Sequence, residues 1–391
     1  MPREISFTHL RAGVIGTGFI GPIHIEALRR LGVQVVAVCG SERARDLARR
    51  WGVPRAFTDY DAKALIESDE VDVVHITSPN RFHREQSLAA LRAGKHCICE
   101  KPLAMDSRET AEIARVAARS PRVFAVNYNV RFYPAILQLR AGVARGDFGE
   151  VIHVNGSYFQ DWLLKETDYN WRLLPEEGGP LRAVADIGSH WLDAASFILS
   201  SPIASLLADL STFHKTRRRP RGEVQTFARA AGRRATVPFR VRTEDFASVL
   251  LRFRSGVYGN MAVSQVAGGR KNSIRFEIYG SKKSAWWDSE RPEVILYGTR
   301  DGANEFSMRN TPGFSDDIAG WTDYPAGHCE GYPDTFKMLY RAVYGAIAGG
   351  KPKAPLYATA EDGHRELKIC EAVLKSHRRA RWVDVGRRVD V

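Results

Sequence analysis

Residues 11–22 read Arg-Ala-Gly-Val-Ile-Gly-Thr-Gly-Phe-Ile-Gly-Pro, and this stretch decides the fold of the first third of the chain. An apolar run precedes the glycines, and apolar residues recur at helical spacing over residues 23–31. Glycines at the spacing G-x-G-x-x-G, between a strand and a helix, are typical of dinucleotide binding. Gly16 would allow the tight turn, Gly18 the approach of a pyrophosphate, and Gly21 close packing of helix on strand. The alternative is a tight turn in another kind of α/β protein.

The start of the following helix is the second part of this expected site. Phe19 and Ile20 lie between the glycines, and Pro22 suits a first helical turn because its missing N–H costs nothing there. Unpaired N–H groups at a helix N-terminus attract phosphate. We therefore expect Phe19 and Ile20 to contact the cofactor together with the three glycines.

Strand and helix patterns alternate through the first third of the chain, which predicts a parallel, doubly wound α/β sheet of the Rossmann type. The expected strands are 11–15, 33–39, 55–58, 71–77, 95–99 and 123–128. The expected helices are 22–31, 42–51, 61–68, 83–93 and 107–120.

Beyond about residue 130 the pattern changes to strands with few helices between them, which predicts an α+β domain with a large, mostly antiparallel open sheet. The expected strands are 151–160, 203–210, 246–253, 258–266, 275–279, 285–288 and 294–297. The expected helices are 135–144, 184–199, 333–348 and 360–377. We therefore divide the chain into a dinucleotide-binding domain, 1–130, and a domain for substrate binding and oligomerisation, 131–391.

Composition is that of a globular protein, with 391 residues, 44% of them hydrophobic. Five scattered cysteines form no disulfide framework, and no apolar run is long enough to be a signal or a membrane span, so we expect a cytoplasmic protein without membrane contact. Cys97 and Cys99 lie on one face of an expected strand, which favours core packing over metal binding, and we expect no metal site.

Much of the net charge of +12 comes from the stretch 215–242, in which Glu223 is the only acid between Lys215 and Arg242. A basic stretch can bind nucleic acid, but aromatic residues are not interleaved with the basic ones here as they would be in a base-stacking platform. We favour a solvated basic loop and expect no nucleic-acid partner.

The end of the second expected strand bears on the choice of cofactor. An acidic residue at this point would bind the ribose hydroxyls of NAD. Here Ser41 and Arg43 would suit the 2′-phosphate of NADP, while Glu42 argues for NAD. We expect NAD(P), with a slight preference for NADP.

Other strand ends supply the remaining expected site residues, because the carboxyl ends of parallel strands face the ligand. Lys101 stands out as a lysine at a strand end that is followed by proline; a surface lysine before a turn is the alternative. Among the other strand-end residues, we expect the cofactor to contact Thr77, Asn80, His83, Glu100 and Asn129 as well as Lys101, and the substrate to contact Arg131 as well as Lys101.

A second group lies in the expected helix 184–199. Asp186 and His190 are four residues apart and would share a helical face, which Asp193 continues. A histidine held by a carboxylate can relay protons near neutral pH, so these residues are a candidate acid/base pair. The alternative is a helix N-terminal carboxylate beside a partly buried histidine without a catalytic task.

Taken together, these motifs resemble those of the Gfo/Idh/MocA oxidoreductases, which include glucose–fructose oxidoreductase and inositol dehydrogenase. The resemblance depends on the three glycines, Thr77 to Asn80 with His83, Glu100-Lys101-Pro102, Asn129 with Arg131, and Asp186-x-Gly188-x-His190. It implies hydride exchange between a nicotinamide and a carbon of a sugar or polyol. It further implies that Lys101 holds the reacting hydroxyl, that His190 is the acid/base, and that Asp186 orients His190 or binds a neighbouring hydroxyl.

This sequence departs from the family pattern in one loop. The family often has three glycines shortly before the aspartate, whereas Gly178-Gly179-Pro180 lies farther upstream here. Because that loop borders the substrate, the resemblance does not name the sugar. Two other classes compete with a dehydrogenase: a glycosidase that oxidises its substrate transiently with bound NAD, and a regulator that only senses a dinucleotide. Intact Lys101 and His190 argue against the regulator.

Aromatic and polar residues between 158 and 172 suit a carbohydrate, which presents apolar faces and hydroxyl edges. From this stretch we expect Trp162, Trp171 and Arg172 to contact the substrate, although a loop packed by its own tryptophans is an equal alternative. The later sheet is expected to leave one apolar face uncovered and to form a homodimer or homotetramer through it. The residues expected on that face are Val249, Leu251, Phe253, Met261 and Val263.

Overall fold

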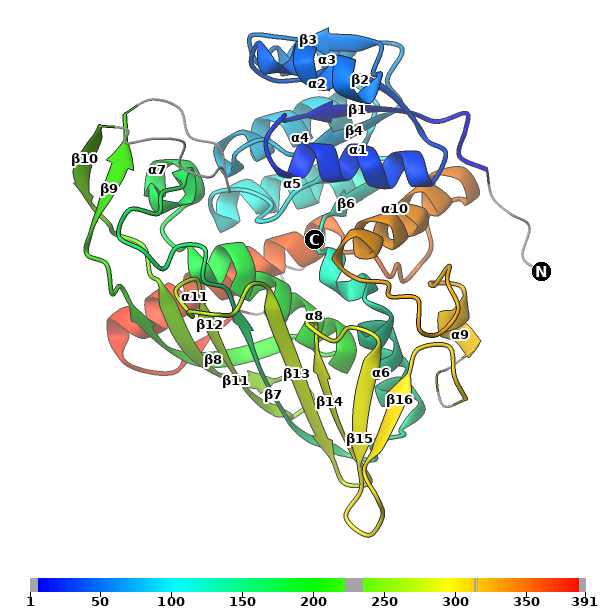
Figure 1. Cartoon of the computed structure of the whole chain (residues 1–391), viewed down its shortest axis with the longest axis vertical. Coiled ribbons are helices and arrows are strands. Elements are labelled where there is room, and N and C mark those ends of the chain that lie inside the picture. The colour runs from blue at the N-terminus through cyan, green and yellow to red at the C-terminus, as the bar shows by residue number, and fades with distance from the viewer. Residues whose placement is uncertain (1–5, 222–234, 313, 315, 387–391) are drawn as a thin grey trace.

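Two β-sheets organise the computed structural model, which describes residues 6–221, 235–312, 314 and 316–386 (Figure 1). The first is a six-stranded sheet in the order β3-β2-β1-β4-β5-β6, and all of its strand pairs are parallel. Its strands are β1 (Arg11–Ile15), β2 (Gln34–Cys39), β3 (Arg55–Phe57), β4 (Val73–Ile76), β5 (His96–Cys99) and β6 (Phe124–Val126). The predicted Rossmann sheet is confirmed, and the strand order reverses between β1 and β4, where such sheets bind their ligands.

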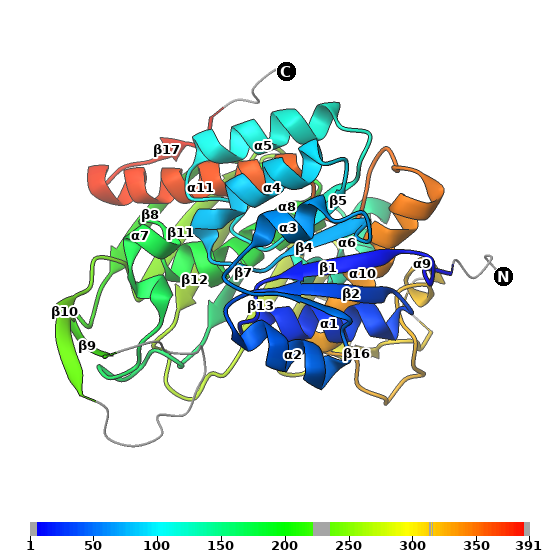
Figure 2. The same ribbon diagram turned by 90° about the horizontal axis from the view of Figure 1, so that it is seen from above.

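Helices cover both faces of this sheet (Figure 2). They are α1 (Ile20–Arg30), α2 (Arg43–Trp51), α3 (Ala62–Glu67), α4 (His83–Arg92) and α5 (Ser107–Arg119), with the short turns η1 (Asn80–Phe82) and η2 (Asn129–Phe132). Because both faces are covered, the strands are almost wholly apolar, and Cys97 and Cys99 are buried between them as expected.

The second sheet has nine strands in the order β16-β15-β14-β13-β7-β12-β11-β8-β17. Its central strand β7 pairs in parallel with β12, and the other pairs are antiparallel. The prediction of a mostly antiparallel sheet is therefore confirmed. Its strands are β7 (Val151–Phe159), β8 (Ile203–Ser211), β11 (Phe246–Phe253), β12 (Tyr258–Ser264), β13 (Ser273–Gly280), β14 (Ser284–Asp288), β15 (Val294–Gly298), β16 (Glu305–Met308) and β17 (Val383–Asp384).

The helices of the second part join it to the first. The helix α10 contacts α1 and η2, while α11 contacts α5 and β8. In addition, the N–H of Val126 in β6 donates to the carbonyl of Ala358 at 2.8 Å. The elements are α6 (Pro134–Arg145), η3 (Trp171–Leu173), α7 (Pro175–Gly178), the π-helical turn η4 (Val184–Gly188), α8 (Ser189–Leu199), α9 (Asp316–Ala319), α10 (Tyr332–Gly349) and α11 (Ala360–Arg379). Within the described part of the chain, no helix is both long and apolar enough to cross a membrane.

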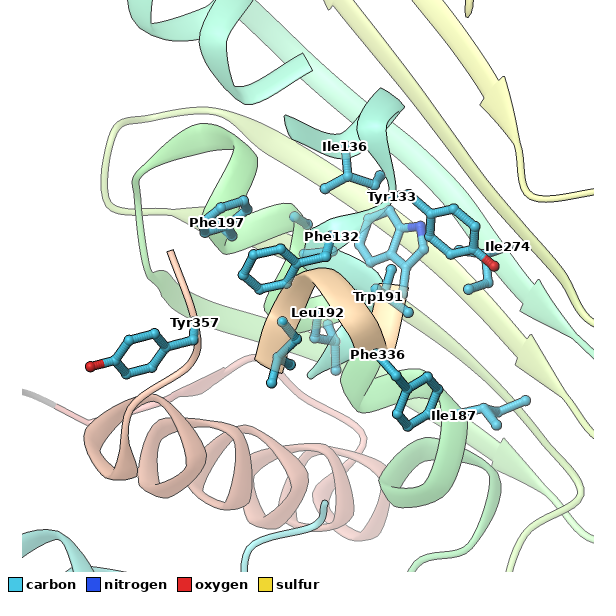
Figure 3. Packing of buried hydrophobic residues seen from close by; sticks show 14 of the residues in the cluster. Phe132, Tyr133, Ile136, Ile187, Trp191, Leu192, Phe197, Ile274, Phe336 and Tyr357 are labelled. Atoms are coloured by element: carbon cyan, nitrogen blue, oxygen red, sulfur yellow. The ribbon is translucent and has the colours of Figure 1, made fainter. Parts of the chain in front are cut away.

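Trp191 fixes the position of α8 against the second sheet (Figure 3). Its ring stacks on Phe276 of β13 with centroids 5.0 Å apart, and its Nε1 donates to the Arg275 carbonyl at 2.8 Å. A Cβ on Gly156 of β7 would lie 2.3 Å from that nitrogen, so only glycine leaves room for the indole. The residue before this anchor is His190, whose place is thereby determined.

The prediction of which face of the second sheet is uncovered is wrong. Val249, Leu251, Phe253, Met261 and Val263 are all buried in the main core, on the face that the helices cover. Alternation along the strands exposes the opposite face instead, and this face carries Leu250, Tyr258 and Phe306. A period of two predicts that the faces differ but does not tell which one the helices cover.

The basic stretch is only partly described, because Arg229, Arg233 and Arg234 lie outside the described residues. On either side of that gap, β9 (Thr216–Pro220) and β10 (Thr236–Arg240) form an antiparallel two-stranded ribbon. Arg217 in β9 has no exposed surface and pairs with Asp245 at 3.0 Å. The prediction of a solvated basic loop is therefore wrong for Arg217. The carboxylate of Asp245, which immediately precedes β11, neutralises its charge.

We expect Gly21→Ala to destabilise the protein, because a Cβ at this position would lie 2.2 Å from the carbonyl oxygen of Gly16. Overpacking of this kind costs about 1–3 kcal/mol, against a gain of about 1 kcal/mol in helix propensity. Urea unfolding checks the result. Gly18→Ala is the matched control, since a Cβ there meets no atom within 4 Å. Equal unfolding free energies for the two variants would contradict the packing role of Gly21.

Candidate active site

The glycine loop between β1 and α1 forms an open cradle. Gly16 has a φ of +110°, and a Cβ there would lie 2.6 Å from the Thr77 carbonyl oxygen. Gly21 is just as confined by Gly16, whereas the space around Gly18 is free. The two outer glycines thus serve the turn, and the central one leaves its backbone accessible.

The first turn of α1 supports binding of an anion at this cradle. Phe19 occupies the position before the helix, with helical backbone angles, and an apolar side chain cannot cap the N–H groups of the turn that begins at Ile20. N–H groups at the start of a helix favour phosphate. The residues present therefore fit a dinucleotide, and the position of its pyrophosphate beside Gly18 stays a prediction.

The end of β2 carries charges of both signs. Glu42 forms an ion pair with Arg45, one turn into α2. Ser41 precedes Glu42, and Arg43 begins α2. These side chains lie at the carboxyl edge of the sheet, where the predicted ribose site would be.

Four predicted cofactor residues make hydrogen bonds to neighbouring groups of the chain, three of them to backbone carbonyls. Thr77 Oγ1 lies 2.9 Å from the Ile15 carbonyl, and Asn80 donates to the Gly178 carbonyl at 3.1 Å. The His83 ring lies between the carbonyls of Ser78 and Pro102, and Asn129 donates to Thr335 of α10 at 2.7 Å. Their contacts with a dinucleotide stay predictions.

Glu100 is a buried carboxylate at the end of β5. Burial alone would raise its pKa, but the hydrogen bond and charge of His24, with the Lys101 charge and Asn127, lower the pKa of Glu100 to about 2. Its Oε2 also accepts from the backbone N–H of Lys101 at 3.2 Å. Glu100 is therefore an anion that positions the backbone of the next residue.

Lys101 links the two halves of the chain. Its Nζ donates to the Asp186 carbonyl oxygen at 2.8 Å and to Asp186 Oδ1 at 3.1 Å. Their side chains are 11% and 12% exposed, so the pair is largely shielded but reachable. The sequence placed both residues in the site, and the structure brings them into direct contact.

The Asp186 carboxylate has two further partners. Arg172 Nε lies 3.0 Å from Oδ1, and Gln265 Nε2 donates to Oδ2 at 2.8 Å. Burial acts to raise its pKa, but the charges of Arg172 and Lys101 outweigh this and hold the pKa of Asp186 well below its usual range. Asp186 is therefore ionised at neutral pH.

The expected pairing of Asp186 with His190 is not formed. Asp186 lies in the π-helical turn η4, in which backbone hydrogen bonds join residues five apart. A residue four positions further on therefore does not lie on the same side of the helix as Asp186. His190 instead packs against the rings of Tyr128 and Tyr158, and its Nδ1 has no hydrogen-bond partner among the described residues.

The prediction that His190 titrates near neutral pH is also contradicted. Burial and the nearby Lys101 charge lower the pKa of His190 to about 3. The imidazole is therefore neutral at physiological pH. A neutral ring with a free nitrogen is able to accept a proton.

Asp193 and Arg131 form a separate buried ion pair. Arg131 Nη2 and Nε lie 2.5 and 2.7 Å from the two oxygens of Asp193, and Asp362 lies 3.6 Å from the same guanidinium. Arg131 is thus committed to a structural pair rather than to a substrate, and Asp193 does not continue the catalytic face.

The predicted sugar-contact residues lie on one loop beside Asp186. The Arg172 guanidinium stacks on the Trp171 ring at 4.4 Å while its Nε faces Asp186. Trp162 donates to Gln160 at 2.8 Å and packs against the small apolar cluster around Leu163. Arg172 therefore reaches the candidate site directly, and Trp162 also serves loop packing.

Sequence reasoning missed Gln265 and Tyr332. Gln265 follows β12 without any motif to mark it. Tyr332 opens α10, where burial together with the charges of Glu100 and Asp186 raises its pKa, which places its hydroxyl near both carboxylates. A glycine before it and a proline after it mark only the start of the helix.

Comparison with known proteins agrees with this geometry. The model of the oxidoreductase family with an NAD-binding Rossmann fold matches residues 10–128. The model of the GFO/IDH/MocA C-terminal domain matches residues 136–286.

Individual relatives match over almost their whole length. An oxidoreductase domain protein from Kribbella flavida is 31% identical, with a TM-score of 0.86, over 97% of this chain and 99% of its own. Levoglucosan dehydrogenase of Pseudarthrobacter phenanthrenivorans is 28% identical over 96% of this chain and 98% of its own. A structure of levoglucosan dehydrogenase in complex with NADH and levoglucosan superposes with a TM-score of 0.86 at 26% identity, covering 97% of this chain and 100% of that one.

His190 predicts a pH dependence of stability. Because its pKa is lowered to about 3 in the folded state, the unfolded chain binds more protons, and stability is lost as pH falls from about 6.5 toward 3. We expect His190→Asn to lose less stability over this range, by up to about 1.4 kcal/mol for each pH unit. Urea unfolding at several pH values measures the difference. The control is the same change at exposed His9, and parallel curves for the wild type and His190→Asn would refute the expectation.

Proposed function

The chain belongs to the Gfo/Idh/MocA oxidoreductases, and from this premise we propose that Lys101, His190 and Asp186 act on one ring hydroxyl of a cyclic sugar, anhydrosugar or polyol. The reaction class is hydride exchange between nicotinamide and a hydroxyl-bearing carbon. The division into residues 1–130 for the dinucleotide and 131–391 for the substrate is part of the proposal.

One observation carries the assignment of roles. The Lys101 ammonium is clamped by the carbonyl and carboxylate of Asp186, while burial keeps the nearby His190 ring neutral. A fixed cation and an uncommitted neutral base, at the carboxyl edge of a dinucleotide-binding sheet, are what oxidation of an alcohol requires.

The residues divide the work as follows. Lys101 donates to the reacting oxygen and stabilises the negative charge that forms on it, and His190 accepts the hydroxyl proton. Asp186 holds Lys101 and remains an anion throughout. Bound nicotinamide supplies the hydride acceptor or donor. In the reduction direction, His190 returns the proton to the oxygen.

Substrate class is supported by the loop beside Asp186 and by the named relatives. Trp171 and Trp162 offer apolar faces, and Arg172 offers hydrogen-bond donors. Relatives that match most of this chain are a levoglucosan dehydrogenase and a myo-inositol 2-dehydrogenase of Thermotoga maritima, the latter 25% identical over 94% of this chain and 96% of its own. We propose a cyclic substrate of similar size that carries several hydroxyl groups.

Cofactor preference is a finer point of the proposal. Ser41 and Arg43 suit a 2′-phosphate, and the Arg45 ion pair engages the Glu42 carboxylate that would otherwise favour NAD. These observations support acceptance of NADP, while a levoglucosan dehydrogenase structure contains NADH. A cytoplasmic location is supported by five free cysteines, four of them buried.

We expect the wild-type protein to change nicotinamide absorbance with at least one member of a panel of levoglucosan, methyl glucosides and inositols, tested with NAD and NADP. His190→Asn should lower turnover about 10²–10⁴-fold, because it removes the base, and Lys101→Ala should lower it severely. Arg43→Ala should weaken NADP about tenfold or more relative to NAD.

The controls of this experiment separate its alternatives. Both catalytic variants should keep dinucleotide affinity, because neither residue is assigned to the pyrophosphate. Glycoside cleavage without net reduction of free cofactor would favour the glycosidase. Dinucleotide binding without turnover on any substrate would favour a regulator, and wild-type turnover by His190→Asn would refute the assignment of the base.

Assembly is proposed through the exposed face of the second sheet. Exposed apolar side chains on a sheet face mark an interface, and a closed dimer or a dimer of dimers is the symmetric solution. Leu250 and Tyr258 lie on neighbouring strands of this face. Light scattering at micromolar concentration should give a dimer or tetramer mass, and Leu250→Glu should reduce it. A monomer mass for the wild type would exclude this assembly.

A further inference from the structure

Gln265 lies directly behind the Asp186 carboxylate, and it is completely buried. It follows β12 of the second sheet, whereas Asp186 lies in the turn before α8. Its Nε2 donates to Asp186 Oδ2 at 2.8 Å, and its Oε1 accepts from Arg182 Nη1 at 2.9 Å. The amide therefore bridges the candidate catalytic carboxylate to a buried arginine.

Arg182 determines which way this amide faces. A guanidinium has only donors, so it requires the carbonyl oxygen of Gln265 as its partner. The NH₂ group must then face Asp186, where it meets a pure acceptor. The opposite orientation would place a donor against a donor and an acceptor against an acceptor.

Arg182 is itself held from several sides. Its Nη2 donates to Asp245, its Nε lies 3.3 Å from Thr243 Oγ1, and neither Arg182 nor Asp245 has any exposed side chain. Asp245 also accepts from Arg217 and from the backbone N–H of Phe213 at 2.7 Å. Because Thr243, Asp245 and Gln265 each hold a different nitrogen of Arg182, its guanidinium cannot turn without breaking several bonds.

We propose that Gln265 is a positioning residue for the reaction: its amide holds Asp186 Oδ2, so that Oδ1 and the Asp186 carbonyl face Lys101. This inference rests on the proposed function and extends it. A buried series of ion pairs connects the ribbon β9–β10 to Gln265 and so restrains the contact between Asp186 and Lys101. The series consists of Arg217, Asp245 and Arg182. Without the amide of Gln265, the Asp186 carboxylate could rotate about its Cβ–Cγ bond, and its hydrogen bond to the Lys101 ammonium would be less firmly positioned.

The groups that face Asp186 come from several elements. Lys101 follows β5, and Arg172 lies in η3; both favour the carboxylate anion. The others are His190 of α8, Tyr158 of β7 and Tyr332 of α10. None of these faces Oδ2 as Gln265 does, so a change at Gln265 acts on that oxygen.

Two variants test the proposal by kinetics. Gln265→Met removes the donor at similar volume, and we expect kcat to fall tenfold or more with unchanged affinity for the dinucleotide. Gln265→Glu places a second carboxylate against Asp186, which disfavours the Asp186 anion. Because the pKa of Asp186 lies well below its usual range in the wild type, Asp186 should give no acidic limb there, whereas Gln265→Glu should shift the kcat profile so that an acidic limb appears in the pH range where the protein is folded.

Gln138→Glu is the matched control, because Gln138 of α6 is equally buried and lies beside Tyr297. It should leave the pH profile in place. Wild-type kcat in Gln265→Met, or an unshifted profile in a folded Gln265→Glu protein, would overturn the proposal. A shift of the same size in Gln138→Glu would also overturn it, since buried charge in general would then be the cause.

A double-mutant cycle keeps the test independent of the assigned reaction. Gln265→Met and Asp186→Asn are made singly and together, and unfolding is followed in urea. Non-additive midpoint shifts are expected because the two side chains share a hydrogen bond. Additive shifts would overturn the contact. If no substrate turns over but the cycle is non-additive, the proposed function fails while the positioning of Asp186 by Gln265 stands.

Discussion

The contact between Lys101 and Asp186 is the interaction on which the candidate site depends. A single ammonium group binds both the carbonyl and the carboxylate of one residue, so it has little freedom to move. Lys101 ends a strand of the first sheet, and Asp186 leads into the helix that packs on the second. The ion pair therefore adds to the contacts of α10 and α11 a direct link between a strand end of the first sheet and the turn before α8.

A buried ion pair is stable only when both charges are fully hydrogen-bonded, because removal from water costs several kcal/mol for each ion. This condition explains the polar series behind Asp186. Arg182, Asp245 and Arg217 have no exposed side chains, and each has partners from the others or from backbone carbonyl and N–H groups. The ribbon β9–β10 is thus tied to the site by charge rather than by apolar packing.

Apolar packing determines the other side of the site. Trp191 is completely buried against β13 and β7, and it fits only because residue 156 is glycine (Figure 3). His190 precedes Trp191 on α8, so its ring is directed by the same packing toward Tyr128 and Tyr158. Burial then keeps the imidazole neutral, which suits a proton acceptor beside a cationic lysine.

The sequence by itself determined the first sheet, the glycine loop and the identity of most charged residues in the site. Those features follow from local rules: the alternation of strand and helix, the steric demands at Gly16 and Gly21, and the position of Lys101 at a strand end. Tertiary structure decided which of these residues meet. Asp186 pairs with Lys101 rather than His190 because η4 is a π-turn, and Arg131 pairs with Asp193 because both are buried in one core. Gln265 and the covered face of the second sheet also came only from the fold, since a contact between residues far apart in the chain leaves no periodic signal in either segment.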